Sequence, residues 1–179
     1  RHVTNTSLVA ISPVKGNGFA GRVFGQWQLA PIVSMRTGLP INVIDGADIS
    51  QTGIGFDRPN RVSGVDPYLS TGNPTQYLNR AAFKIQAAGT FGNMGRNQMV
   101  APGAINFDMS LSRTFRITER WQLTPRAEAF NVTNHTNFAS PVTSVGSPSA
   151  SAAILSSSQF GVITAATDPR ILQFALKLQ

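Results

Sequence analysis

Three charged residues, Asp108, Arg126 and Glu128, have the types and spacing that acid–base chemistry would need. Two carboxylates beside an arginine can exchange protons with a substrate in a hydrolase. All three occupy even positions in segments where apolar and polar residues alternate, so they share one polar face. A row of charges that faces a barrel lumen, and so keeps each charge out of lipid, explains the pattern better than a catalytic pair. We therefore predict no catalytic residue and no enzyme.

The other motifs that could hold a cofactor or a metal are weak. Residues 89–95, with the sequence GTFGNMG, lack the Gly-Lys-Ser/Thr of a phosphate loop and are not followed by a helical pattern. His2 and His135 lie far apart, and the chain has no Cys. We predict a loop turn at 89–95, and no cofactor or metal.

Candidate ligand-binding residues lie in a long connection that is rich in Gly and Pro. They are Asp57, Arg58, Asn60 and Arg96. Loops on a rigid scaffold often carry binding residues. Asp and Asn beside Pro also form turns, which is the alternative role for these residues.

Composition excludes several classes of protein. The 179 residues include 15 Lys and Arg against 8 Asp and Glu, for a net charge of +7. The basic residues are scattered, with no run of three, so we expect no nucleic-acid partner. No window approaches the ~18 consecutive apolar residues of a membrane-spanning helix. Charged residues are only 13% of the chain, which suits strands joined by turn-rich loops.

Alternation with a period of two predicts five strands, at residues 3–11, 26–36, 104–117, 121–132 and 170–178. In the third strand the odd positions are mostly apolar and the even positions are polar. The fold class is therefore all-β, an antiparallel up-and-down meander. The apolar rows of these strands are about as long as a tilted strand that crosses a bilayer. This length favours strands of a transmembrane β-barrel.

The apolar row is predicted to face lipid, and the residues of opposite parity are predicted to face the lumen. The lipid-facing residues are Leu29, Val33, Met35, Ile105, Phe107, Met109, Leu111, Leu123, Ala127, Ala129, Leu172, Phe174, Leu176 and Leu178.

The connections between these strands alternate in length. Ser12–Gly25 and Ile117–Arg120 are short, whereas 38–103 and 133–169 are long. A structureless connection of some 60 residues is unusual in a compact domain. Outer-membrane barrels have short turns on one side and long extracellular loops on the other, so the pattern favours a barrel.

Aromatic residues are predicted to gather at the short-turn side. Trp27, Phe115 and Trp121 all fall at strand ends on that side, where an interfacial aromatic girdle is expected. Arg113 faces lipid by parity, and its place near a strand end predicts that it snorkels to the interface.

Two prolines lie inside predicted strands. Pro31 and Pro125 each remove one hydrogen bond from a ladder. We expect a bulge or a locally open ladder at each.

Residues 25–43, GQWQLAPIVSMRTGLPINV, resemble a strand of Oar-like TonB-dependent receptors, which carry a carboxypeptidase-regulatory-like domain at their N-terminus. Further similar pieces follow in the same order as in that family. They are 56–60 (FDRPN), 78–83 (LNRAAF), 89–97 (GTFGNMGRN), 102–103 (PG), 106–108 (NFD), 126–131 (RAEAFN), 160–161 (FG), 168–170 (DPR) and 173–178 (QFALKL).

The resemblance implies that residues 1–179 are a single partial domain, the last five or so strands of a 22-stranded barrel in the outer membrane of a Gram-negative bacterium. Such receptors import an extracellular ligand, and the TonB system supplies the energy through a plug that these residues do not include. The implied partners are the lipid bilayer, TonB and an unidentified ligand. The family usually ends in an aromatic residue, so we expect the true C-terminus to lie one or a few residues beyond Gln179.

Two other classes remain open at this point. A soluble β-sandwich that binds or adheres would show the same alternation, with its apolar rows interlocked in a dry interior. Burial of Leu111 and Leu176 against an opposing sheet would favour that class. A hydrolase is the weakest alternative, because no nucleophile and base are visible as a set.

Overall fold

The computed structural model describes residues 1–14, 16, 18–73, 75–141, 152–154 and 158–179. The chain divides into two compact units. The strand unit contains His2–Arg36, Ala104–Asn137 and Asp168–Gln179, and the loop unit contains Arg1, Thr37–Gly103 and Phe138–Thr167.

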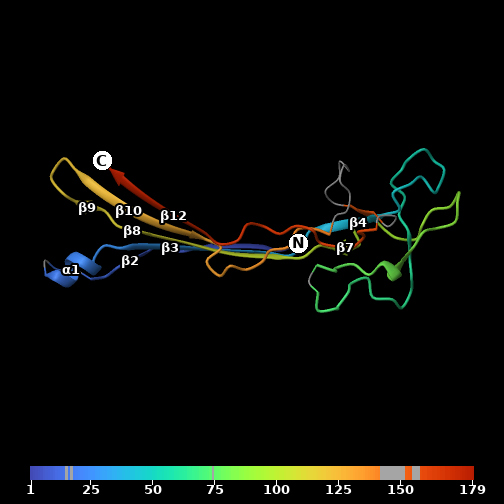
Figure 1. Ribbon diagram of the computed structural model, residues 1–179, viewed down its shortest axis with the longest axis horizontal. Coiled ribbons are helices and arrows are strands. Elements are labelled where there is room, and N and C mark those ends of the chain that lie inside the picture. Colours follow the sequence, from blue (N-terminus) through green and yellow to red (C-terminus); the bar gives the residue numbers. More distant parts are fainter. Residues whose placement is uncertain (15, 17, 74, 142–151, 155–157) are drawn as a thin grey trace. The chain divides into compact units, whose positions relative to one another are not determined.

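The strand unit is one antiparallel sheet in which strands follow one another up and down. Its strands are β1 (Val3–Ser7), β2 (Ala10–Ile11), β3 (Gln28–Arg36), β8 (Ala104–Ser112), β9 (Phe115–Arg116), β10 (Gln122–Phe130) and β12 (Ile171–Leu178). The order is β1-β3-β8-β10-β12, with β2 on β3 and β9 on β10, and Figure 1 shows these strands side by side. The predicted all-β meander is confirmed. In the part of the chain that the structure describes, the sheet does not close into a barrel, and β1 and β12 are its edges.

Strand register places the predicted lipid-facing row on one face of this sheet. Leu111 lies opposite Leu29 on one side and Ala127 on the other, and Ala127 in turn lies opposite Phe174. Directly paired residues point to the same face. The same registers join the remaining members of the row from β3 to β12.

No layer of the described residues covers this apolar face. Leu111 is 38% exposed, Leu176 is 68% exposed and Phe174 is 77% exposed. A sandwich would bury these side chains in a dry interior, so the soluble β-sandwich is not the fold of this sheet. An apolar face of this extent requires a non-aqueous surrounding.

The opposite face carries the charged residues predicted for a lumen. Arg126 and Glu128 form an ion pair at 2.6 Å, with Glu128 opposite Ser110 on the neighbouring strand. Asp108 accepts a hydrogen bond from the backbone N–H of Asn131 at 2.9 Å. These charged groups therefore have polar partners on their own face of the sheet.

Both internal prolines open the ladder without shifting its register. Pro125 separates β8 from β9, yet the pairing continues unchanged from Ser112–Arg126 to Phe115–Leu123. Pro31 lies opposite the gap between β1 and β2, where its carbonyl still accepts from the Leu8 N–H at 3.1 Å. A locally open ladder, one of the two expected outcomes, is thus confirmed, because each proline lacks only its N–H.

A short helix, α1 (Phe19–Phe24), interrupts the first connection, and the alternation pattern did not predict it. The indole N–H of Trp27 donates to the Val23 carbonyl at 2.8 Å, which ties the end of α1 to the start of β3. Within the residues that the structure describes, no helix is long and apolar enough to cross a membrane.

The loop unit contains short strands around a core of its own. Its elements are β4 (Pro40–Ile44), β5 (Asn60–Arg61), η1 (Arg80–Ala82), β6 (Phe83–Lys84), β7 (Met99–Val100) and β11 (Ala152–Ile154). Strand β4 pairs with β7 and β11, and β5 pairs with β6.

Buried side chains from distant parts of both long connections form the core of the loop unit. Ile41 and Leu78 are 1% and 2% exposed, and the rings of Phe83 and Phe160 meet edge to face at 5.5 Å. The predicted connections 38–103 and 133–169 are therefore packed, although residues 142–151 and 155–157 of the second lie outside the described residues.

Candidate functional site

The loop unit holds a small pocket of about 160 Å³. Two segments line it, and the lining residues are Thr52, Ile54, Phe56, Asp57, Arg58, Phe91 and Gly92. The segments are joined by side chains: Arg58 Nε donates to the Met94 carbonyl at 2.9 Å, and Asn60 Oδ1 accepts from the Asn93 N–H at 2.9 Å.

Local hydrogen bonds shape the first of these segments. Asp48 accepts from the backbone N–H of Thr52 at 3.0 Å and of Gly53 at 2.6 Å. Asp57 accepts from both the N–H and the hydroxyl of Ser50, at 2.6 and 2.9 Å. Desolvation raises the pKa of Asp48, but the hydrogen bonds from Gly53 and Thr52 outweigh it, so the pKa is lowered overall. Asp48 and Asp57 thus stabilise the turns of this segment through hydrogen bonds to its backbone.

The sequence-predicted ligand residues occupy different places in this unit. Asp57 and Arg58 both line the pocket, although Asp57 is only 8% exposed and its carboxylate is engaged by Ser50. Asn60 lies just outside, in β5, and braces the second segment. Arg96 is exposed and does not line the pocket.

Exposed apolar side chains at this pocket were not predicted from the sequence. Phe91 is 75% exposed, Ile54 is 62% exposed and Phe56 is 56% exposed. Each follows or precedes a glycine, and an aromatic residue flanked by glycine in a polar loop was the available signal. Two phenyl rings and Arg58 line the same pocket, so the rings can contact the apolar part of a ligand while the arginine binds an acceptor group.

The loop unit also contains a buried carboxyl group, that of Asp45. Asp45 is 1% exposed and Gln86 is 5% exposed, and neither has a well-formed side-chain hydrogen bond within the described residues. Burial raises the pKa of Asp45, the nearby Asp57 raises it further, and the Gln86 amide offsets part of the rise.

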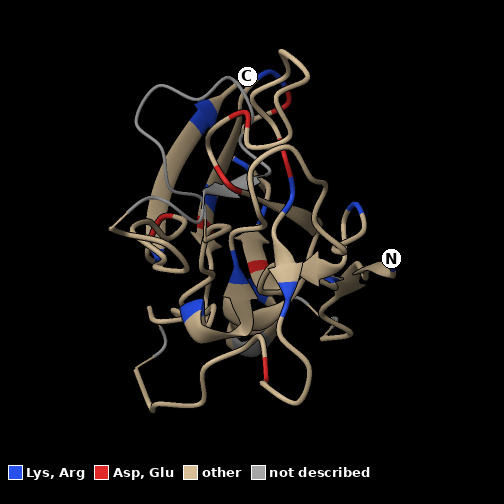
Figure 2. Ribbon diagram, turned by 90° about the vertical axis from the view of Figure 1, so that its right-hand side faces the viewer, with Lys and Arg blue, Asp and Glu red and all other residues tan. Residues whose placement is uncertain are grey.

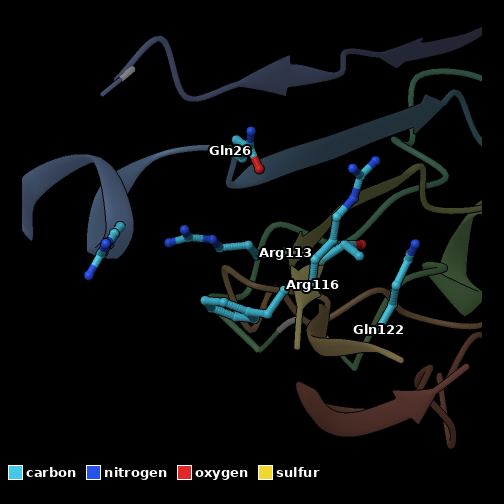
Figure 3. A pocket seen from close by; sticks show the side chains of 7 residues that line it. Gln26, Arg113, Arg116 and Gln122 are labelled. Carbon is cyan, nitrogen blue, oxygen red and sulfur yellow. The ribbon is translucent and has the colours of Figure 1, made fainter. Parts of the chain in front are cut away.

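The strand unit has a second, larger cavity of about 650 Å³ at the short-turn end of its strands (Figure 3). Its lining residues are Arg22, Gln26, Arg113, Thr114, Phe115, Arg116 and Gln122. Figure 3 shows the Arg113 side chain extending toward the helix α1. Figure 2 shows charged residues thinly scattered along the ribbon, so three arginines around one cavity are a local concentration of positive charge.

Arg113 does not snorkel as predicted from its parity. Its side chain is only 8% exposed, and its Nη1 donates to the Val23 carbonyl at 2.7 Å. The guanidinium carbon lies 4.4 Å from the Phe115 ring centre and 5.9 Å from that of Trp27. The expectation that Arg113 faces lipid is therefore wrong, because α1, which the sequence did not reveal, supplies a nearer acceptor and the two rings cover the cation.

The predicted aromatic cluster at the short-turn end is present in part. The rings of Trp27 and Phe115 meet edge to face at 6.5 Å. Trp121 is 52% exposed and follows the turn at 117–120. Across the described ranges, no group of three or more His, Asp or Glu residues is placed to hold a metal ion.

Comparison with known proteins identifies the class of this chain. Residues 1–173 match the family described as "Outer membrane beta barrel domain". The chain belongs to this family, and its protein is located in the outer membrane. No curated protein and no solved structure matches the chain.

Proposed function

We propose that this chain is part of an outer-membrane receptor that imports an extracellular ligand with energy from the TonB system. The family match supports the barrel and the outer-membrane location. The ordered resemblance to Oar-like receptors, from residues 25–43 to 173–178, supports the finer assignment.

The main support for a receptor role is the packed loop unit, which has a pocket open to solvent. The unit is formed by the two long connections, and long connections of such barrels are extracellular. Its pocket exposes Phe56, Phe91 and Ile54 beside Arg58. Exposed apolar side chains that gather at one pocket are typical of ligand-binding sites, so we assign ligand capture to this pocket.

The open edges of the sheet support a larger barrel. Among the described residues, strands β1 and β12 each have one neighbour, and unpaired backbone groups are not tolerated in the hydrocarbon region. Further strands would therefore pair with both edges, and a barrel that exceeds these strands can enclose the plug of a TonB-dependent receptor.

Energy coupling can be tested without knowledge of the ligand. The protein expressed from its complete gene is purified in detergent, and binding to the periplasmic domain of TonB from the same bacterium is measured by interferometry. An outer-membrane porin serves as the control. Specific binding to the complete protein is expected, and equal signals from the two proteins would refute TonB coupling.

The pocket is tested by growth on a panel of single nutrient sources. Strains that lack either this gene or the TonB gene should fail on the same source. Restoring the gene with Arg58→Ala or Phe91→Ala should leave uptake reduced, whereas Arg96→Ala, outside the pocket, should restore it fully. Full growth with both pocket variants would assign capture to another part of the protein.

A further inference from the structure

Asp45 and Gln86 are buried in the loop unit with polar atoms that no neighbouring group satisfies. Asp45 is 1% exposed and Gln86 is 5% exposed, and among the described residues neither oxygen of the carboxyl group and neither polar atom of the amide has a hydrogen-bond partner. No protonation state of Asp45 removes the deficit, because the carboxylate lacks a donor and the protonated acid lacks an acceptor. Buried groups of this kind indicate that the side chains bind water or an ion.

A second buried carboxylate, that of Asp57, lies close to Asp45. The backbone N–H of Asp45 donates to the Asp57 carbonyl at 2.8 Å, and the charge of Asp57 contributes to the raised pKa of Asp45. Within the described part of the chain, neither carboxylate takes part in an ion pair. Arg58, which follows Asp57, directs its Nε to the Met94 carbonyl. Two neighbouring buried carboxylates without a basic partner favour a bound cation between them.

The side chains that meet here offer oxygen atoms to a cation. Each oxygen of Asp57 accepts one hydrogen bond from Ser50, at 2.6 and 2.9 Å, and retains a further lone pair. The Gln86 amide adds a neutral oxygen close to Asp45. Oxygen ligands select hard cations. Calcium accepts mixed carboxylate and amide oxygens in irregular geometry, whereas magnesium requires a nearly ideal octahedron, so this set favours calcium.

We propose that Asp45, Asp57 and Gln86 bind a calcium ion in the loop unit. Asp57 also lines the pocket that Phe56 and Phe91 share, so the ion would fix one wall of that pocket. The long connections of outer-membrane barrels are extracellular, and calcium sites of extracellular modules have a Kd of about 0.1–1 mM. The expectation of no metal rested on His and Cys, and oxygen ligands that only the fold brings together leave no such motif in the sequence.

The test uses the complete protein, purified in detergent and freed of divalent cations with a chelator. Calcium binding is measured by equilibrium dialysis, and unfolding is followed by calorimetry with and without calcium chloride. Calcium should raise the melting temperature of the loop unit, and magnesium should raise it less. Asp45→Asn keeps the size of the side chain, and it should weaken calcium binding at least about tenfold. Asp66→Asn makes the same change of charge at an exposed position in the same unit, and it should bind calcium as the unchanged protein does.

Misfolding of the variant is distinguished from loss of the site by its melting in chelator. There Asp45→Asn should melt at or above the temperature of the unchanged protein, since a buried charge has been removed, and calcium should abolish this advantage. Equal calcium affinity of Asp45→Asn and Asp66→Asn would overturn the site. A melting temperature that calcium does not raise would assign Asp45 and Gln86 to bound water instead, and an equal rise with magnesium would overturn the choice of calcium. None of these measurements depends on TonB or on the imported ligand.

Discussion

A charged residue placed at the middle of β12 should destabilise the barrel strongly on one face and weakly on the other. Phe174 is 77% exposed on the apolar face, and its neighbour Gln173 points to the polar face, opposite Glu128. The two positions lie at nearly the same depth, so Phe174→Arg and Gln173→Arg differ chiefly in the medium that receives the guanidinium.

The size of the effect follows from the position along the strand. Phe174 is separated from the ends of Ile171–Leu178 by about 10 to 13 Å of strand. With a tilt of about 45°, this places it about 7 to 9 Å from either end along the membrane normal. An arginine costs about 2–4 kcal/mol at the midplane, and the lost phenyl transfer adds to that. We expect about 3–5 kcal/mol for Phe174→Arg.

Gln173→Arg should change stability by less than about 1 kcal/mol, since the new cation faces Glu128 across the strand pair. The assay is urea unfolding of the complete protein in phosphatidylcholine vesicles, followed by tryptophan fluorescence. Phe174→Leu, which keeps an apolar side chain, is the control for loss of the ring. A cost for Gln173→Arg equal to or above that of Phe174→Arg would refute the assignment of the two faces.

Three further outcomes are expected. Pro125→Val supplies the missing N–H opposite Arg113, so it should stabilise the hairpin by about 1 kcal/mol and slow amide exchange there, and unchanged exchange would contradict the open-ladder account. Gly92→Ala places a Cβ against the Arg58 carbonyl, so it should lower the melting temperature of the loop unit and weaken ligand capture, as calorimetry and uptake can check. Burial raises the pKa of Asp45 above its ordinary value of 3.8, so ionisation of Asp45 destabilises the folded unit as the pH rises through the raised pKa. With divalent cations removed, Asp45→Asn should therefore stabilise the unit by about 1–3 kcal/mol at pH 7 and should have no effect on stability at about pH 3. A stabilisation that does not vary with pH would exclude this cause.

The sheet was predictable because each of its strands has two different faces. Alternation assigned Leu29, Leu111, Ala127 and Phe174 to one row, and the observed registers join those residues directly. A shift of one residue would move a whole row to the wrong face, so parity determines register as well as strand position. The effect of each proline was also local and could be derived from its missing N–H.

The loop unit and the cavity lined by Arg22, Arg113 and Arg116 were not predictable in the same way. The pocket depends on contacts between distant segments, such as Arg58 with Met94, and the sequence has no period that relates them. Arg96 was grouped with Asp57 by composition alone, and the fold separates it from the pocket. The burial of Arg113 required α1, a helix too short to give a periodic signal.

The junctions between sheet and loops allow the loop unit of this protein to be exchanged. The connection that leaves β3 at Arg36 returns at Ala104, its direct partner across the ladder, and the connection that leaves β10 at Phe130 returns at its partner Ile171. Because each connection starts and ends at two residues that are paired directly across the ladder, insertions and deletions within the connection need not alter any strand pairing. Evolution can thus change the loop unit while the sheet is inherited unchanged, and a designer can graft a new loop structure onto the same two strand pairs.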